Sequence, residues 1–197
     1  MNITLARHAQ TLANREGIVL GRSDSSITAS GQMASAKLAP MIPQTATGMI
    51  CSSPLGRAVA TAQVFAAALG WPVTIMDTLT ELSCGAWEGM PRASVMPEGR
   101  ALRSSWTDSP PGGESCAGAQ ARVKEAILGL HSLAHENILV VGHAGINQVF
   151  LKMLLGLEPE QALKIRHPHD VLYRIEGSVV TWLDSSGSSG KGFFRRP

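Results

Sequence analysis

The strongest structural signal in the sequence is the segment Ile138-Leu139-Val140-Val141-Gly142-His143-Ala144-Gly145. Four consecutive apolar residues without alternation are typical of a strand that is covered on both faces, as in a parallel sheet. The Gly-His-Ala-Gly turn leads directly into a segment whose apolar residues Ile146, Val149, Phe150 and Met153 recur at helical spacing. A buried strand followed at once by a helix predicts a parallel sheet with helices packed on it.

The rest of the chain repeats this alternation of strands and helices. Further strands are predicted at residues 2–6, 49–51 and 72–76, and a terminal hairpin at residues 171–175 and 178–183. Helices are predicted at residues 28–42, 55–69 and 114–134. The sequence therefore predicts an α/β fold, a three-layer α/β/α sandwich whose sheet is mostly parallel with an antiparallel edge strand.

Length and composition favour one domain. The chain has 197 residues, of which 44% are hydrophobic and 16% charged, which is enough apolar material for a sizeable core. We assign residues 1–184 to this domain and expect residues 185–197, rich in Ser and Gly and basic at the end, to form a flexible tail. Residues 77–113 carry many Gly and Pro residues, and a loop of this length is usually functional or partly helical.

The charge and the cysteines limit the partners and the compartment. The chain has 17 basic and 15 acidic residues, and without residues 185–197 the counts are 14 and 15, so the body is neutral. A nucleic-acid partner is therefore not expected. No run approaches the roughly 18 apolar residues that span a bilayer, so no membrane partner is expected. Three cysteines, an odd number, and no leader segment predict a cytoplasmic protein. As a separate expectation, the protein is a monomer or a homodimer.

Cationic side chains follow the predicted strands at the edge where open α/β sheets bind ligands. Arg7-His8 follows the first strand, Ser52-Ser53 and then Arg57 follow the second, and His143 follows the strand at 138–141. Helix N-termini at the same edge offer free backbone N–H groups. Two guanidinium groups and two imidazoles there predict a pocket for a dianion such as a phosphoryl group.

Hydrolysis of a phosphoester also needs a nucleophile and a proton donor. Imidazole can accept a phosphoryl group covalently, which divides one difficult displacement into two easier ones. Glu81, at the start of the irregular segment, is placed to protonate the leaving alkoxide, with Glu88 and Glu114 as nearby rivals.

Five motifs in order carry a family resemblance. The segment Leu5–Thr11, with Asn14 after it, resembles the Arg-His-Gly signature of the histidine phosphatase superfamily, the phosphoglycerate-mutase-like proteins. Similar matches follow at residues 52–58, at Glu81 with residues 85–89, at residues 111–115 and at residues 141–145. The resemblance extends to about residue 175.

The resemblance implies roles for six residues. His8 would be the phosphorylated nucleophile, and Glu81 would act first as acid and then as the base that activates water. The phosphoryl oxygens would be bound by Arg7, Arg57 and His143, with assistance from Asn14. Ala9 departs from the family's usual glycine, and we expect this change to be harmless because alanine is small.

Within the family, a phosphatase is favoured over a cofactor-dependent phosphoglycerate mutase. The segment from Glu81 to Gly89 resembles the phosphatase version, and the chain is compact. Pro111-Gly112-Gly113-Glu114-Ser115 followed by Arg122-Val123 resembles the α-ribazole phosphatases, so α-ribazole phosphate is one candidate among small phosphorylated metabolites. A non-catalytic phosphate-binding or scaffolding domain is the alternative of another class, although such a domain needs no proton donor.

Other chemistries have weaker support. His131 with His135, and His167 with His169, could contribute to a metal site, but no Cys pair or His-Glu-x-x-His motif accompanies them, so no metal and no cofactor are expected. Ser115 lies in a segment that resembles a nucleophile elbow, except that the second glycine comes one residue late. Cys84 and Cys116 have no phosphate-binding loop beside them and are expected to be core or loop thiols.

Overall fold

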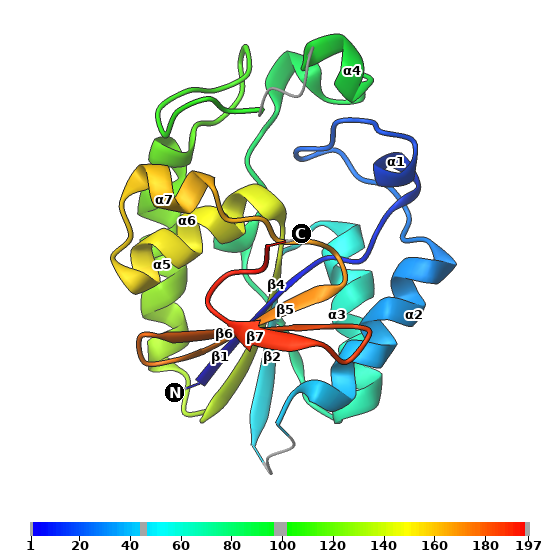
Figure 1. The fold of residues 1–197 in the computed structure, drawn as a ribbon, viewed down its shortest axis with the longest axis vertical. Coiled ribbons are helices and arrows are strands. Elements are labelled where there is room, and N and C mark those ends of the chain that lie inside the picture. The colour runs from blue at the N-terminus through cyan, green and yellow to red at the C-terminus, as the bar shows by residue number, and fades with distance from the viewer. Residues whose placement is uncertain (1, 44–46, 97–101, 196–197) are drawn as a thin grey trace.

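A computed structural model of the chain describes residues 2–43, 47–96 and 102–195. Its centre is a seven-stranded sheet in the order β3-β2-β4-β1-β5-β6-β7 (Figure 1). The strands are β1 (Asn2–Arg7), β2 (Gly48–Ser52), β3 (Val73–Ile75), β4 (Asn137–Gly142), β5 (Val171–Glu176), β6 (Val179–Asp184) and β7 (Ser189–Lys191). Strands β3, β2, β4 and β1 are parallel, whereas β5, β6 and β7 pair antiparallel. The predicted α/β fold, mostly parallel with an antiparallel edge, is confirmed.

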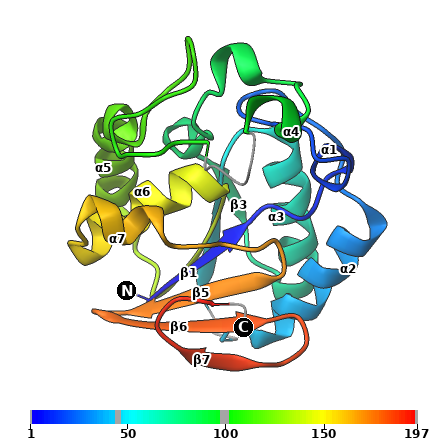
Figure 2. The ribbon, with the colours of Figure 1, turned by 45° about the horizontal axis from the view of Figure 1, so that its top comes forward.

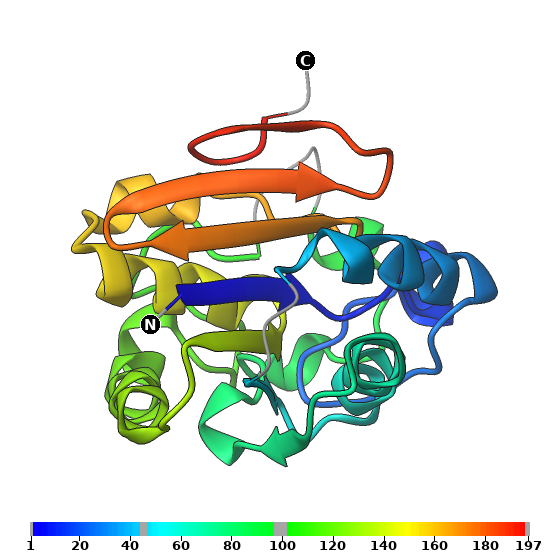
Figure 3. The same cartoon turned by 90° about the horizontal axis from the view of Figure 1, so that it is seen from below.

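Helices cover both faces of the sheet and complete the three layers (Figure 3). One face carries α2 (Ala29–Leu38), the short η1 (Ala39–Met41) and α3 (Gly56–Leu69), and the other carries α5 (Cys116–Ser132), α6 (Ala144–Leu155) and α7 (Pro159–Leu163). Each face has its own apolar cluster: Leu5 packs with the α5 and α6 side, and Ala6 packs with the α2 and α3 side. This alternation follows from the two-residue period of a strand.

Strand β4 has the burial that the sequence pattern predicts. All six of its residues are buried, because β2 and β1 pair with its two edges and helices cover both of its faces. A continuous apolar run is the composition that such a site requires.

The helix predicted at residues 114–134 begins two residues later than expected. Ser115 is the N-cap of α5, and its hydroxyl accepts a hydrogen bond from the Gly118 N–H at 3.0 Å. Glu114 therefore lies outside the helix, and its carboxylate pairs with Arg122 at 2.8 Å. Capping by a serine hydroxyl fixes the start of this helix.

The prediction of a flexible tail over residues 185–197 is wrong for residues 185–195. Strand β7 pairs with β6, the ring of Phe193 lies 5.7 Å from that of Tyr173, and the ring of Phe194 lies 5.0 Å from that of Trp182. The two phenylalanines bury apolar area that the Ser/Gly composition of this segment did not suggest. Residues 196–197 lie outside the described residues.

The irregular segment lies over the carboxyl ends of the parallel strands. It contributes η2 (Asp77–Leu79), η3 (Gly85–Trp87) and α4 (Arg92–Val95), and α4 lies near α1 (Leu12–Arg15) above the sheet (Figures 1 and 2). The backbone links the two regions, because the Val19 N–H donates to Met90 O at 2.9 Å and the Arg92 N–H donates to Gly17 O at 2.8 Å. These loops cover the carboxyl-end edge of the sheet, where the sequence predicts the site.

None of the helices in the described ranges is both long and apolar enough to cross a bilayer.

Candidate active site

The strand register brings the predicted cationic residues together. Arg7 on β1 is level with Gly142 on β4, and the His8 N–H donates to Gly142 O at 2.9 Å. On the other side of β4, the Ser53 N–H donates to Val141 O at 3.0 Å. His8, Ser53 and His143 are therefore neighbours at one edge of the sheet, although 135 residues separate the two histidines.

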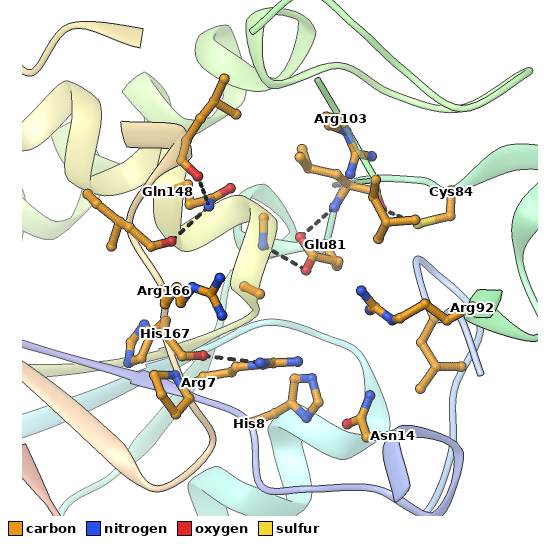
Figure 4. A pocket seen from close by; sticks show the side chains of 18 of the residues that line it. Arg7, His8, Asn14, Glu81, Cys84, Arg92, Arg103, Gln148, Arg166 and His167 are labelled. Carbon is orange, nitrogen blue, oxygen red and sulfur yellow. Dashed lines mark hydrogen bonds between the residues drawn. The ribbon is translucent and has the colours of Figure 1, made fainter. Parts of the chain in front are cut away.

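A cavity of about 430 Å³ opens at this edge (Figure 4). Five of the six predicted site residues line it: Arg7, His8, Asn14, Arg57 and Glu81. The sixth, His143, is fully buried behind them, and its ring centroid lies 5.1 Å from that of His8. We call Arg7, His8, Arg57 and His143 the cavity floor.

His8 is held as a neutral imidazole in one tautomer. Its Nδ1 lies 2.8 Å from the carbonyl oxygen of Ala9, which can only accept, so Nδ1 carries the proton and Nε2 keeps its lone pair. Burial, and then the neighbouring His143 and Arg7, hold the pKa of His8 well below its usual 6.5. The Ala9 N–H donates to the Thr61 hydroxyl at 2.8 Å, which anchors the residue after the histidine.

His143 is also fully buried. Its Nε2 lies 2.8 Å from the Ser53 hydroxyl, and its buried Nδ1 has no partner among the described residues. Burial, followed by the charges of Arg57 and Arg7, holds the pKa of His143 well below its usual value. Within the described residues, the ring is therefore held on one side only, by the Ser53 hydroxyl.

One backbone carbonyl accepts a hydrogen bond from each terminal nitrogen of Arg57. Its Nη1 donates to Ser23 O at 2.6 Å and its Nη2 donates to Gly21 O at 2.7 Å, and the residue is only 2% exposed. The carboxylate of Asp24 lies 3.3 Å from Nη1. The guanidinium is thus oriented before any ligand arrives, and its Nε has no partner in the described part of the chain.

Arg7 lies beside Arg57 and remains a cation. Its Nη1 donates to His167 O at 3.1 Å, and its buried Nε has no partner in the ranges that the structure describes. Burial lowers the pKa of Arg7 to about 10, although the charge of Glu81 opposes this change. A guanidinium with that pKa is still protonated at neutral pH.

Glu81 is the carboxylate at the centre of the cavity (Figure 4). Its Oε1 accepts N–H groups from Leu82 and Ile146, both at 2.8 Å, and its Oε2 accepts the Gly145 N–H at 3.0 Å. The carboxylate therefore sits at the N-terminus of α6, where the helix dipole favours negative charge. Position 145 needs glycine, because a Cβ there would lie 2.9 Å from Glu81 Oε1.

The other two candidate proton donors, Glu88 and Glu114, form hydrogen bonds outside the cavity. Burial raises the pKa of Glu88, but the backbone N–H groups of Arg22, Ser23 and Cys84 together bring it below its usual value. Glu114 is held by Arg122, with Nε and Nη2 donating to its two oxygens at 3.1 and 2.8 Å. Neither carboxylate lines the cavity, whereas Glu81 does.

Asn14 presents an amide donor to the cavity. The N-cap Thr11 and Asn14 exchange hydrogen bonds at the start of α1, and Asn14 Oδ1 accepts the Thr11 N–H at 3.2 Å. This bond occupies the carbonyl side of the amide and leaves Nδ2 for a ligand.

Several residues of the site were not predicted from the sequence. His169 lies 5.0 Å from His8 between ring centroids, and its Nδ1 lies 2.7 Å from His8 O, with its pKa lowered to about 3 by burial. Three further arginines, Arg92, Arg103 and Arg166, also line the cavity, and we call them the cavity rim (Figure 4). No motif marks these arginines, because they come from the irregular segment and from the loop after α7.

The sequence also offered a metal site, a serine nucleophile and two cysteine nucleophiles, and the structure supports none of these within the described ranges. In the described ranges, no group of three or more His, Cys, Asp or Glu residues could hold a metal ion. Both ring nitrogens of His167 are engaged, Nδ1 with the Asn147 amide and Nε2 with Val171 O, each at 3.0 Å. Ser115 caps α5 and does not line the cavity. Burial raises the pKa of the Cys84 thiol and raises that of Cys116 to about 11, so both stay protonated at neutral pH.

Comparison with known proteins identifies the class of this chain. The family model described as histidine phosphatase superfamily (branch 1) matches residues 3–182. The chain therefore belongs to the histidine phosphatase superfamily.

Relatives within this family include both phosphatases and mutases. The "Adenosylcobalamin/alpha-ribazole phosphatase" of Escherichia coli (strain K12) is 30% identical over 166 residues, which cover 81% of this chain and 82% of that protein. The "Probable phosphoglycerate mutase GpmB" of Yersinia enterocolitica serotype O:8 is 30% identical over 191 residues, 94% of this chain and 89% of that protein. The crystal structure of the alpha-ribazole phosphatase from Shigella flexneri has a TM-score of 0.76 at 27% identity, covering 89% of this chain and 90% of that one.

Proposed function

We propose that this chain is a phosphomonoester hydrolase that acts on a small phosphorylated metabolite through a phosphohistidine on His8. One observation carries the proposal: the neutral His8 imidazole, with Nδ1 bound to Ala9 O, lines a cavity that also holds two oriented guanidinium groups and a carboxylate. Nucleophile, anion site and proton carrier are the three parts that phosphoryl transfer through an enzyme intermediate requires.

The residues of the cavity floor bind the phosphoryl group. Arg7 and Arg57 supply two fixed cations, with Nε donors that have no partner among the described residues. The Asn14 amide and the unpartnered Nδ1 of His143 supply further polar contacts. Because these groups are held before the substrate arrives, little reorganisation is needed as charge develops on the phosphoryl oxygens.

Transfer then proceeds in two steps. In the first, His8 Nε2 attacks phosphorus, the ester P–O bond breaks, and protonated Glu81 gives its proton to the leaving alkoxide. In the second, the Glu81 carboxylate takes a proton from water, the water oxygen attacks phosphorus, and the P–N bond breaks to release phosphate. Glu81 can serve both steps because its two oxygens accept the N–H groups of Gly145 and Ile146 at 3.0 and 2.8 Å, which holds the carboxyl group at the cavity.

Hydrolysis is favoured over a mutase reaction, and the substrate is to be identified from a panel of phosphoesters. The resemblance of residues 81–89 to the phosphatase version and the similarity to alpha-ribazole phosphatases support a phosphatase. The similarity to a phosphoglycerate mutase keeps the mutase as the second candidate. Incubation with 3-phosphoglycerate separates them, because a phosphatase releases inorganic phosphate whereas a mutase yields 2-phosphoglycerate. α-Ribazole phosphate belongs in the same panel.

The phosphohistidine is the direct test. Rapid acid-free quenching with a ³²P-labelled phosphoester is expected to trap a base-stable, acid-labile label that peptide mapping assigns to His8. His8→Ala should carry no label, and His131→Ala, which changes an exposed histidine of α5, should carry it as the unmodified protein does. Label on Ser115 or on a cysteine would contradict the proposal, and absence of any turnover would favour the phosphate-binding or scaffolding role.

The remaining expectations stay predictions: an acid phosphatase-type activity without a cofactor, a cytoplasmic location, no nucleic-acid or membrane partner, and a monomer or a homodimer.

A further inference from the structure

The cavity has more positive charge than one phosphoryl group requires. The described residues that line it include five arginines and a single carboxylate, Glu81. Arg7 and Arg57 belong to the floor beside His8 and serve the phosphoryl group in the proposed function. The three arginines of the rim remain to be explained.

Arg103 is already occupied by the protein. Its Nε donates to Glu114 O at 2.8 Å and its Nη2 donates to Ser83 O at 2.9 Å. These bonds tie the segment after residue 101 to the loop that follows Glu81, so Arg103 has a structural task.

Arg92 and Arg166 differ from Arg103 because, within the described residues, neither guanidinium donates to a backbone carbonyl. Both are exposed, and neither forms an ion pair with any carboxylate in residues 2–43, 47–96 or 102–195. The Arg92 side chain makes one weak contact, from Nη1 to Met96 Sδ at 3.6 Å. Their donors are therefore available to a ligand.

The backbone at Arg166 is nevertheless held firmly. Gln148 Nε2 donates to Ile165 O at 2.9 Å and to Leu163 O at 3.2 Å, and the Tyr173 hydroxyl donates to Arg166 O. Arg7 donates to the next carbonyl, that of His167. This support fixes the point from which the Arg166 side chain extends beside Arg7 (Figure 4).

Arg92 reaches the cavity from the opposite side. The Arg92 N–H binds Gly17 O, and an isolated bridge joins the neighbouring residues Ile18 and Pro91, so α4 is attached to the loop after α1. In Figure 4 the guanidinium of Arg92 points toward Glu81 from one side, and that of Arg166 lies on the other. Arg92 is close enough to Arg7 for its charge to contribute to the lowered pKa of Arg7.

We propose that Arg92 and Arg166 form a subsite for a second anionic group on the alcohol part of the substrate. This inference rests on the proposed function, because it places the phosphoryl group at the floor and the second anion at the rim. The substrate class is then a phosphoester of an acidic alcohol, in which the second group is a carboxylate or a second phosphate. α-Ribazole phosphate, whose base carries no acid, fits this subsite less well. Guanidinium groups recognise carboxylate and phosphate equally by bidentate hydrogen bonds.

Pairs of substrates that differ only in the second group test the subsite. 3-Phosphoglycerate against glycerol 3-phosphate measures the contribution of a carboxylate, and fructose 1,6-bisphosphate against fructose 6-phosphate measures that of a second phosphate. For one of the two pairs we expect kcat/KM to favour the acidic member by about tenfold or more, chiefly through KM. The pair that shows the preference identifies the second anion.

The variants Arg92→Met and Arg166→Met should each reduce that preference by about tenfold, because methionine keeps an unbranched apolar chain but removes the charge-assisted bonds. Arg15→Met is the matched control, since Arg15 is an exposed arginine of α1 that does not line the cavity. It should leave the preference unchanged. Circular dichroism of each variant shows that the fold is retained.

Three results would overturn the subsite: equal kcat/KM within both substrate pairs, an equal loss for acidic and neutral substrates in the two variants, or an equal loss of preference in Arg15→Met. Failure of the proposed function looks different. Labelling of His8 without a preference for acidic substrates removes only the subsite, whereas absence of phosphate release from every substrate, including p-nitrophenyl phosphate, contradicts both.

Discussion

The floor and the rim of the cavity both contain arginine side chains, but the two regions are fixed in different ways. Floor residues follow the ends of parallel strands, and backbone carbonyls hold His8 and Arg57 in one orientation with almost no exposure. Arg92 of the rim begins the short helix α4 and Arg166 lies in the loop after α7; both are exposed and have no acidic partner in the described ranges. The floor is thus built for one invariant chemical step, whereas the rim can select what the phosphoryl group is attached to.

The largest effect is expected at the nucleophile of the floor. His8→Ala should lower the rate of phosphate release by at least about 10³-fold, because it removes the imidazole that accepts the phosphoryl group. Titration calorimetry should still detect phosphate binding, since Arg7 and Arg57 remain. Activity within tenfold of the unmodified protein would mean that another group is the nucleophile and that the floor is only a binding site.

A smaller loss is expected when the oriented guanidinium is replaced. Arg57→Lys should lower kcat/KM by about 10²-fold, because one ammonium group cannot bind Gly21 O, Ser23 O and a phosphoryl oxygen in the planar arrangement of guanidinium. Steady-state kinetics with p-nitrophenyl phosphate measures this loss. An unchanged kcat/KM would show that charge alone, without orientation, suffices at the floor.

Replacement of the proton carrier should depend on the leaving group. Glu81→Gln is expected to slow alkyl phosphates by about 10²-fold and aryl phosphates much less, since a phenolate leaves without protonation. Glu88→Gln is the contrasting variant: Glu88 holds the Arg22 and Ser23 N–H groups next to the carbonyls that orient Arg57, so it should slow both substrates alike. Equal losses in Glu81→Gln would argue against proton donation.

The smallest expected effect is on stability against pH. Burial lowers the pKa of His167 to about 3 from a usual 6.5, so the unfolded chain binds the extra proton first as the pH falls. The stabilisation is complete above about pH 6.5 and is lost as the pH falls toward 3, at up to about 1.4 kcal/mol per pH unit for one such histidine. Urea unfolding between pH 4.5 and 7 measures the slope.

His167→Asn should reduce that slope by about one proton, whereas His131→Ala, at an exposed position, should leave it unchanged. The same slope in His167→Asn would show that the buried histidine is not the group that couples pH to folding.

The sequence analysis succeeded where a local pattern has a single structural meaning. The apolar run at residues 138–141 indicates a strand covered on both faces, and its place between two parallel strands of the sheet follows. Arg7, His8, Arg57 and His143 were predicted because strand ends at one edge of a parallel sheet converge whatever the loops do. Glu81 was predicted from its place at the start of the irregular segment and Asn14 from the family motif, and the structure places both at the cavity.

The errors and omissions share a cause, which is contact between segments distant in the chain. Composition suggested a flexible end for residues 185–197, but Phe193 and Phe194 find aromatic partners on β5 and β6. Likewise Ser53 pairs with His143, and His169 with His8, across 90 and 161 residues, and no spacing along the sequence announces such pairs.

The amino-acid order alone was therefore sufficient for the layer architecture and the cationic edge, because periodicity and strand ends are local properties of the chain. Tertiary packing alone established which carboxylate faces the cavity, which tautomer His8 adopts, and which arginines lack an acidic partner. Those properties depend on the distances and burial of groups that meet only after the chain has folded, and they are the ones that set the chemistry.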